Sequence, residues 1–202
     1  MRKLIAFFAF LVVPLAVGAQ QAGQQPFQYT ELNPPVPVET KGKVEVVEFF
    51  WYGCIHCYNL EPQLEGWLKK LPPDVEFRRI PAVFNERWAH DAAIFYTLEA
   101  LGQLDRLHKP LFDAIHKDRL RTDNAAALAE WLQRQKVDPK KFNDTLRSFG
   151  VQSKTRRAAQ QTVAYKIDGT PAMAVHGRYV VSAQQNMLQA IDSLVDNVRK
   201  QK

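Results

Sequence analysis

Cysteine is almost missing from this chain of 202 residues, which contains only Cys54 and Cys57. Two cysteines cannot complete a zinc site, and neither a second cysteine pair nor a closely spaced histidine pair supplies the other ligands. A permanent disulfide between them would close so short a loop that it would remove little chain entropy, so its value as a structural cross-link is small. The sequence therefore favours a redox-active pair over a metal site or a structural disulfide.

Long apolar runs are absent after the first 19 residues, so we expect no membrane span there. At the amino end, Arg2 and Lys3 precede a nearly continuous apolar run over residues 4–15, and small residues follow at 17–19. The run is short for a membrane span, although an uncleaved anchor is the alternative interpretation. We expect residues 1–19 to be an export signal that is cleaved after Ala19, so that the cysteine pair works where disulfides persist.

The chain also lacks a concentrated charge of one sign. Its 27 Lys and Arg residues exceed its 21 Asp and Glu residues by enough to give a net charge of +6, but the two kinds are interleaved along the sequence. No stacking motif accompanies the basic residues, and scattered Lys and Arg are typical of a solvated surface. We therefore expect no nucleic-acid partner.

The cysteines follow a stretch that predicts a buried strand. Residues 44–50 (VEVVEFF) are rich in β-branched and aromatic side chains and favour a central strand. Cys54 and Cys57 then fall at the start of a helix, where unpaired N–H groups and the helix dipole stabilise the Cys54 thiolate, the form that attacks disulfides. His56 can donate a hydrogen bond or a positive charge to the same sulfur. Cys57 lies further into the helix and is expected to be the more buried, resolving thiol.

Glu48 is unusual because it is an acid within this apolar strand, six residues before Cys54. One interpretation places it at a solvated edge of the sheet, since acids are seldom fully buried. The functional interpretation is a buried acid beneath the cysteines that exchanges protons as they change redox state. Burying a carboxylate is costly unless it is paired or protonated. Arg79, on the next predicted strand, is the candidate partner.

The remaining pattern predicts an α/β fold. Beside the strand at 44–50, we expect strands at residues 27–32, 75–80, 172–175 and 179–181. Residues 88–166 have helical periodicity throughout, and a last helix occupies residues 187–198. Within the helical part, one helix begins at Asp138-Pro139 and extends its apolar stripe to Phe149, and the next covers residues 153–165. The predicted organisation is a discontinuous domain (27–87 and 167–202) with an inserted all-helical domain (88–166).

A strand, a CxxC pair at a helix start, a second strand and a late Thr-Pro before a hairpin resemble the thioredoxin fold. The Cys-x-His-Cys form, the export signal and the long helical insertion are similar to the DsbA family of periplasmic thiol:disulfide oxidoreductases. The motifs that carry the resemblance are 48–50, 54–58, 71–72, 169–172 and 177–179. The resemblance covers essentially all of the chain after the signal. It implies a thioredoxin fold with a mixed central sheet and an inserted helical domain.

The resemblance also implies roles for matching positions. Cys54 would be the exposed nucleophile with a low pKa, Cys57 the resolving thiol, and His56 a group that stabilises the thiolate. Pro171 would be a cis proline beside the disulfide, and Thr170 would offer its backbone to an extended substrate. Glu48 and Arg79 match the buried acid and its basic neighbour. The chain departs from the best-known members at Ile55, where they have Pro, and from some members at Thr170, where they have Val, so its oxidising strength and substrate preference are not fixed by the resemblance.

The implied activity is a dithiol oxidase of the periplasm that donates its disulfide to unfolded or partly folded exported proteins. The disulfide itself holds the two electrons, so no metal or organic cofactor is expected, and a quinone-linked inner-membrane protein of the DsbB type would reoxidise the pair. We expect a monomer. The alternatives are a reductase or disulfide isomerase on the same fold, and a peptide-binding holdase that merely carries the CxxC pair. His90, His108, His116 and His176 have no ligand spacing and are interpreted as ordinary surface or packing residues.

Overall fold

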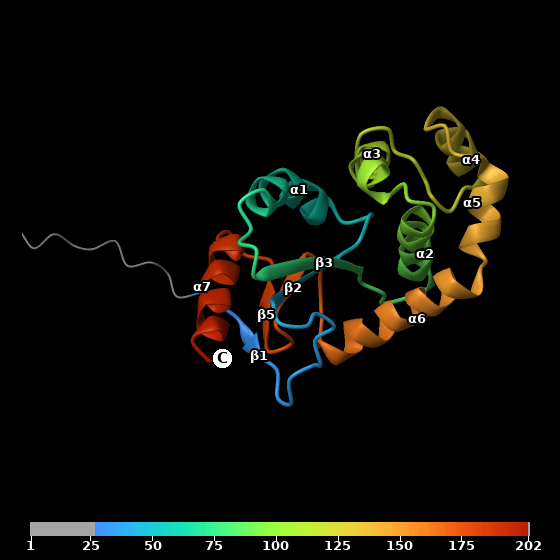
Figure 1. Ribbon diagram of the computed structural model, residues 1–202. Coiled ribbons are helices and arrows are strands. Elements are labelled where there is room, and N and C mark those ends of the chain that lie inside the picture. Colours follow the sequence, from blue (N-terminus) through green and yellow to red (C-terminus); the bar gives the residue numbers. More distant parts are fainter. Residues whose placement is uncertain (1–26, 202) are drawn as a thin grey trace, which may run out of the picture.

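The strand before the cysteine pair is the centre of the molecule. In the computed structural model, which describes residues 27–201, β2 (Val44–Phe50) has all seven residues buried. It lies between two neighbours in a five-stranded sheet (Figure 1). The prediction of a buried internal strand is therefore confirmed, and the end of this strand fixes where the active-site turn begins.

The sheet is mixed, as the family resemblance implies. Its strand order is β1-β5-β4-β2-β3. The strand β3 (Val75–Pro81) runs parallel to β2, whereas β4 (Ala172–Val175) pairs antiparallel with β2 and β5 (Tyr179–Ser182) antiparallel with β4. The edge strand β1 (Thr30–Glu31) is shorter than the predicted 27–32 and pairs antiparallel with β5.

A tight turn joins β4 to β5. Three residues, 176–178, separate the strands, and the N–H of Arg178 donates to the carbonyl of Val175 at 3.0 Å. The two central residues of this β-turn, His176 and Gly177, both have positive φ angles, 51° and 66°. The loop between β1 and β2 packs directly against this turn. The N–H of Val36, in that loop, donates to the carbonyl of Gly177 at 2.8 Å. A side chain at Gly177 would overlap the carbonyl of Val36, so glycine is needed here for both its conformation and its size.

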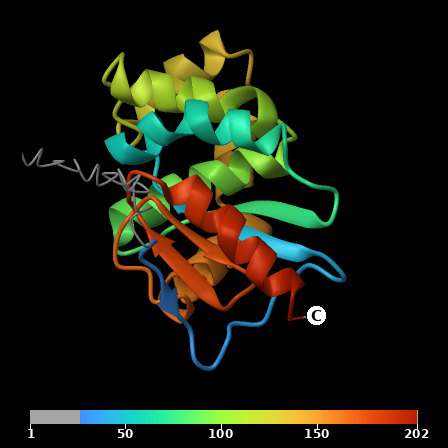
Figure 2. The ribbon, with the colours of Figure 1, turned by 90° about the vertical axis from the view of Figure 1, so that its left-hand side faces the viewer.

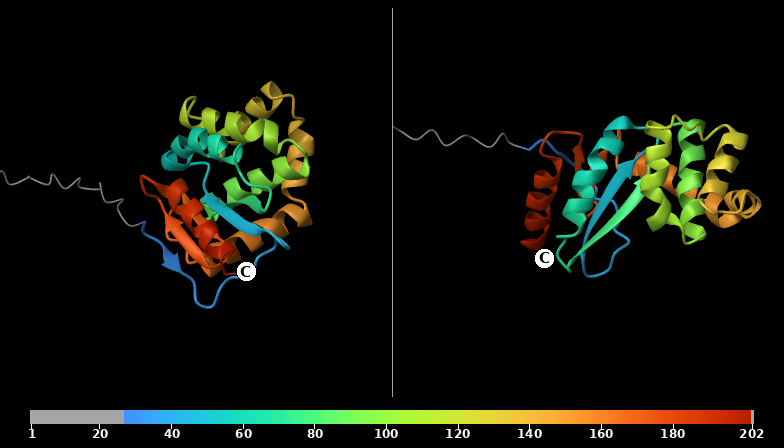
Figure 3. Two further views of the ribbon diagram at one scale, coloured as in Figure 1. Left: turned by 60° about the vertical axis from the view of Figure 1, so that its left-hand side comes forward. Right: turned by 90° about the horizontal axis from the view of Figure 1, so that it is seen from above.

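Helices cover both faces of the sheet. The helix α1 (Ile55–Leu68) follows β2, and α7 (Met187–Arg199) follows β5. Five helices separate β3 from β4 in the chain: α2 (Glu86–Ala100), α3 (Leu104–His116), α4 (Ala125–Arg134), α5 (Pro139–Leu146) and α6 (Phe149–Ala164). Figure 2 shows α7 lying across the strands, and Figure 3 (right) shows α7 and the α2–α6 insert at opposite ends of the molecule.

The two faces of the sheet have separate apolar cores. On one face, Val47 and Phe49 belong to a core shared with the insert, including Phe95 of α2 and Ala158 of α6. On the other face, a second core joins the sheet to α1 and α7; its sheet members include Val44, Val46, Met173, Val175 and Val181. Because side chains alternate along a strand, Glu48 points to the same face as Val44 and Val46. That orientation places its carboxylate beneath α1, not at a sheet edge.

One helix boundary in the insert differs from the prediction. The helix that begins after Asp138 ends at Leu146, and Phe149 is not part of its apolar stripe. Instead, Ser148 caps a new helix with its side chain, and Phe149 is that helix's first residue and is 82% exposed. The cap explains the break, since a serine hydroxyl that accepts the N–H of Val151 satisfies one of the open donors of a new helix.

Candidate active site

Cys54 is the N-cap of α1. Its backbone is extended (φ −86°, ψ 115°), and its sulfur accepts the N–H of Cys57 at 3.4 Å. A sulfur in this position occupies the place where a serine or aspartate oxygen normally caps a helix, so a negative charge on it is stabilised by the open N–H groups and the helix dipole. The first turn contains no acidic residue that would oppose this charge.

The surroundings of Cys54 lower its pKa from 9.0 to about 5. The largest contribution is the hydrogen bond from the Cys57 thiol. Partial burial opposes ionisation, but the Thr170 side chain and the backbone N–H groups of Cys57 and His56 add further hydrogen bonds that favour the thiolate. In the protonated form, the S–H of Cys54 donates to the carbonyl of Thr170 at 3.3 Å. Cys54 is half-buried, which leaves its sulfur open to a partner.

Cys57 has the opposite character. Its side chain is fully buried, and burial raises the pKa of its thiol far above the ordinary value. The hydrogen bond to Cys54 and the nearby charge of Glu48 raise the pKa further. The structure holds both cysteines as free thiols. The pair therefore consists of one accessible sulfur that ionises easily and one buried sulfur that does not.

The Thr170–Pro171 loop lies against the nucleophile. The Thr170–Pro171 peptide bond is cis, as the family resemblance implies, and Pro171 is buried. Next to it runs a groove of about 580 Å³ between the exposed side of α1 and the loop that precedes α7. His56 and Pro171 both line this groove. The imidazole of His56 is exposed and makes no hydrogen bond within residues 27–201, so what reaches Cys54 from His56 in this structure is its backbone N–H.

An aromatic pair borders the active-site turn on the side of the insert. The rings of Trp51 and Trp88 are stacked with centroids 4.3 Å apart. The indole N–H of Trp51 donates to the buried carboxylate of Asp91 at 2.8 Å. The Trp51 ring also covers Gly53, where an added Cβ would overlap it. The insert therefore fixes the residue that precedes the CxxC turn.

Glu48 and Arg79 form the ion pair that the sequence predicts. They occupy paired positions on the parallel strands β2 and β3, and Nε of Arg79 lies 3.0 Å from Oε2 of Glu48. Glu48 is fully buried, which excludes the solvated-edge interpretation. Burial raises the pKa of Glu48 from 4.5 to about 7; the charge of Arg79 opposes this shift and that of Glu61 adds to it.

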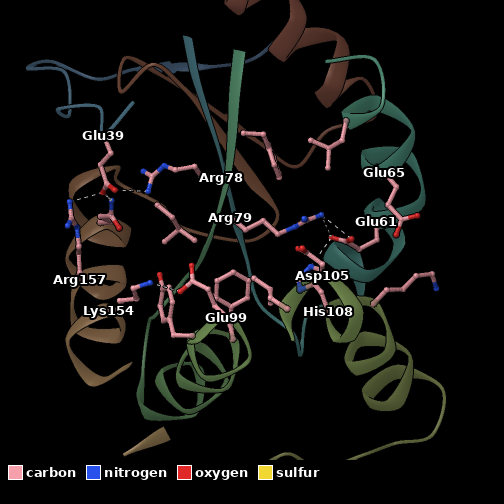
Figure 4. Close-up of a pocket in the computed structure, with 18 residues that line it drawn as sticks. Glu39, Glu61, Glu65, Arg78, Arg79, Glu99, Asp105, His108, Lys154 and Arg157 are labelled. Carbon is pink, nitrogen blue, oxygen red and sulfur yellow. Dashed lines mark hydrogen bonds and ion pairs between the residues drawn. The ribbon is translucent and has the colours of Figure 1, made fainter. Parts of the chain in front are cut away.

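Three residues to which sequence analysis gave no role at the site extend this network: Glu61 of α1, His108 of α3 and Tyr52 of the active-site turn. Nη2 of Arg79 lies 3.2 Å from Oε2 of Glu61, and Nε2 of His108 lies 3.5 Å from Oε1 of Glu61. The hydroxyl of Tyr52 is 2.9 Å from Nδ1 of His108. Figure 4 shows Arg79, Glu61 and His108 together at one end of a cleft of about 560 Å³ between α1, β3 and the insert.

For Glu61 and His108, the sequence holds a local signal of burial. Glu61 lies four residues after Cys57 and three before Leu64, so the three share the buried face of α1. His108 lies next to Leu107 and four residues before Phe112, within the apolar stripe of α3. The interpretation of His108 as an ordinary packing residue was incomplete, because it is both buried and in contact with a carboxylate.

From residue 27 to residue 201, no group of three or more His, Cys, Asp or Glu side chains is arranged to hold a metal ion. In the same range, no helix combines the length and apolar character needed to cross a membrane. The predicted export signal, residues 1–19 with cleavage after Ala19, lies outside the described residues.

Known proteins with similar sequences share this arrangement of elements. Residues 45–192 match the DSBA-like thioredoxin domain family. The thiol:disulfide interchange protein DsbA of Azotobacter vinelandii is 40% identical over 211 residues, covering 98% of this chain and 99% of that protein. The protein of the same name from Bordetella parapertussis is 41% identical over 98% of this chain and 97% of its own length. The crystal structure of Pseudomonas aeruginosa DsbA superposes with a TM-score of 0.80 at 38% identity, covering 85% of this chain and 92% of that one.

Proposed function

The chain belongs to the DsbA family of thiol:disulfide oxidoreductases, and from this premise we propose that it acts as a dithiol oxidase through Cys54 and Cys57. The observation that carries the proposal is the contrast between the two sulfurs. Cys54 is exposed enough to react and has a pKa of about 5, so the reduced form is stabilised by its thiolate. A pair whose reduced form is stabilised gives up its disulfide readily and oxidises other thiols.

The reaction has two displacement steps. A substrate thiolate attacks the sulfur of Cys54 in the enzyme disulfide, the Cys54–Cys57 bond breaks, and Cys57 leaves with the electron pair. A second substrate thiolate then attacks the substrate sulfur of the mixed disulfide, and Cys54 leaves as a thiolate. The substrate loses two electrons and becomes a disulfide, and the enzyme gains them as a dithiol. The low pKa of Cys54 makes it a good leaving group in the second step.

Cys57 needs a proton when it leaves. Its burial makes a lasting thiolate unfavourable, and we assign the proton to Glu48, whose pKa of about 7 allows it to give and take protons near neutral pH. Arg79 holds the carboxyl group in place at 3.0 Å. His56 supports the thiolate through its position in the first turn of α1, and its exposed ring faces the groove that substrates would enter.

Substrate binding is assigned to the loop before β4. The carbonyl of Thr170 lies against the nucleophile, 3.3 Å from the Cys54 sulfur, and Thr170 is only partly buried. An extended polypeptide can pair with the backbone of this partly buried loop, a mode of binding that accepts many sequences. Such tolerance suits unfolded or partly folded proteins with free cysteines as substrates.

The cellular setting is part of the proposal. We expect the mature protein to begin at Gln20, to work in the periplasm as a monomer, and to be reoxidised by a DsbB-like quinone-linked membrane protein. The family membership and the amino-terminal sequence support this setting. Determining the amino-terminal residue of the protein purified from periplasmic extract tests the cleavage after Ala19.

The redox equilibrium of the purified mature protein with glutathione buffers tests the direction of the reaction. A potential well above the glutathione couple supports the oxidase. A potential near that of thioredoxin, about −270 mV, together with an ordinary Cys54 pKa, would establish a reductase or isomerase instead. Cys54→Ala separates the third alternative: if disulfide formation stops while peptide binding persists, the holdase hypothesis is wrong.

A further inference from the structure

His108 connects the helical insert to the buried charges behind the cysteine pair. It lies on α3 and is only 7% exposed. Its ring is enclosed by aromatic side chains, with centroids 5.2 Å from those of Phe50 and Phe112. The two ring nitrogens face different polar groups: Nδ1 lies 2.9 Å from the Tyr52 hydroxyl, and Nε2 lies 3.5 Å from Oε1 of Glu61.

These contacts determine which nitrogen carries hydrogen. Burial lowers the pKa of His108, so the ring is neutral near pH 7 and has one N–H. Burial opposes ionisation of Glu61, but the neighbouring ring of His108 and the charge of Arg79 outweigh it and hold the pKa of Glu61 below its usual value. An ionised carboxylate can only accept, so Nε2 carries the hydrogen and Nδ1 accepts from Tyr52. Burial also raises the pKa of Tyr52, which keeps its hydroxyl proton.

Arg79 alone cannot neutralise the acids beside it. Its guanidinium lies 3.0 Å from Glu48 and 3.2 Å from Glu61, so one positive charge faces two buried carboxyl groups. Such a pair retains one proton near neutral pH, because two negative charges in an apolar interior are costly. The two acids differ in their other contacts. Glu61 also faces Nε2 of His108 at 3.5 Å, a close contact without hydrogen-bond geometry, whereas Oε1 of Glu48 is buried without a hydrogen-bond partner among residues 27–201.

We propose that His108 is a positioning residue that directs the single proton of this pair to Glu48, by holding the positive end of its ring dipole, at Nε2, 3.5 Å from Glu61 and so keeping Glu61 ionised. In this arrangement the fully buried carboxyl with the unpartnered oxygen is the neutral one, which minimises the cost of burial. The proton then lies on the acid next to the cysteine pair, not on the acid at the cleft. The consequence for thiol chemistry rests on the proposed role of Glu48; the placement of the proton does not.

The charged and titratable groups around His108 come from several elements. Arg79 of β3 disfavours a positive charge on His108, whereas Glu61 and Glu65 of α1 favour it. The same cleft is lined, on α2, α3 and α6, by Glu99, Asp105, Lys109 and Lys154. Of these, Lys154 is paired with Glu99 at 2.6 Å and Lys109 with Asp113 at 3.1 Å. The contact from His108 therefore acts on Glu61 more directly than any other group except Arg79.

The test compares His108→Leu with His108→Gln. Leucine fills the apolar space without a donor, whereas the amide of glutamine can place an N–H near the position of Nε2. Glutamate carboxyl carbons labelled with ¹³C would be titrated by NMR in the reduced protein, with Glu48→Gln and Glu61→Gln used to assign the two resonances. In the native protein we expect Glu48 to titrate near pH 7 and Glu61 well below it.

In His108→Leu we expect the Glu48 midpoint to fall and the Glu61 midpoint to rise, each by about one pH unit, because the 3.5 Å contact lacks hydrogen-bond geometry and is therefore weak. His108→Gln should restore the native order. Unchanged midpoints in a folded His108→Leu protein, or equal shifts in both variants, would overturn the proposal. If the leucine variant does not fold, Tyr52→Phe provides the second test: it removes the partner of Nδ1 and should move both midpoints in the same directions by less. A rate defect in Glu48→Gln concerns the proposed function and is measured separately.

Discussion

Replacing Thr170 by valine tests how the chain stabilises its nucleophile. Valine keeps the shape of threonine and its backbone carbonyl, which lies 3.3 Å from the Cys54 sulfur, but it removes the hydroxyl. The Thr170 side chain is one of the hydrogen-bonding groups that lower the pKa of Cys54 to about 5. The substitution therefore removes one donor to the thiolate and leaves the Cys57 thiol, the helix terminus and the backbone donors in place.

The size of the effect follows from the burial of the sulfur. A hydrogen bond to a charged group contributes about 1.5–3 kcal/mol when it is buried. Cys54 is half-buried, so water replaces part of the lost bond and about 1 kcal/mol remains. That energy corresponds to a rise of about 0.7 in the Cys54 pKa. Because the reduced form loses the same stabilisation, the reduction potential should fall by about 20 mV.

The assay is a titration of the thiolate by its ultraviolet absorbance, combined with the redox equilibrium against glutathione. Thr170→Ser is the matched control, since it keeps the hydroxyl and loses only the methyl group. We expect a higher pKa and a lower potential in Thr170→Val and little change in Thr170→Ser. The reasoning fails if valine leaves the pKa where it was, or if serine shifts it as far as valine does.

Three further changes have defined outcomes. The pKa of Cys54 is lower in the folded than in the unfolded protein, so the extra stability of the reduced over the oxidised protein should shrink as pH falls from 8 toward 5. Thermal unfolding of the reduced and oxidised forms measures this extra stability. A stability difference between the two forms that does not change with pH contradicts the prediction. Glu48→Gln should slow formation of the mixed disulfide with a model thiol at pH 7 about 10²-fold by removing the acid that protonates the buried leaving sulfur, and stopped-flow kinetics with an unchanged rate would exclude that role. Gly53→Ala should displace the Trp51 indole, change its fluorescence and destabilise the fold by about 1–3 kcal/mol, whereas Gly66→Ala on α1, where an added Cβ meets nothing within 4 Å, should do neither.

The parts of the site that sequence analysis predicted are those with short-range causes. Cys54 and Cys57 are three residues apart in one helical turn, and the β-branched strand before them fixes where that turn begins. Glu48 and Arg79 lie on adjacent predicted strands, where an acid and a base in an apolar run need each other, and the parallel register joins them. In these cases the local pattern and the cost of burying charge lead to the same arrangement.

The parts that were missed depend on how the insert packs. The distance from His108 to Glu61 depends on the position of α3 against α1, and the distance from Trp51 to Asp91 on the position of α2 against the active-site turn. Periodicity places each side chain on a helix face, but it does not state which helices meet. The wrong prediction for Phe149 has the same origin. Residue spacing alone extended the apolar stripe of the helix after Asp138 to Phe149, whereas in the structure Ser148 caps a new helix and the ring of Phe149 is exposed.

The contacts from His108 to Glu61 and from Asp91 to Trp51 both join the insert to the surroundings of the cysteine pair, so the insert supports the redox site directly. Asp91 holds the indole that covers the turn before Cys54, and His108 contacts the acid that shares Arg79 with Glu48. One contact acts on the accessible sulfur through its geometry, and the other on the buried sulfur through charge. A change in the packing of α2 or α3 would therefore alter both sulfurs without touching either. Substitutions at the α1–α3 contact that preserve the fold should accordingly change redox behaviour more than equally destabilising substitutions on α7, which contributes no residue to either contact.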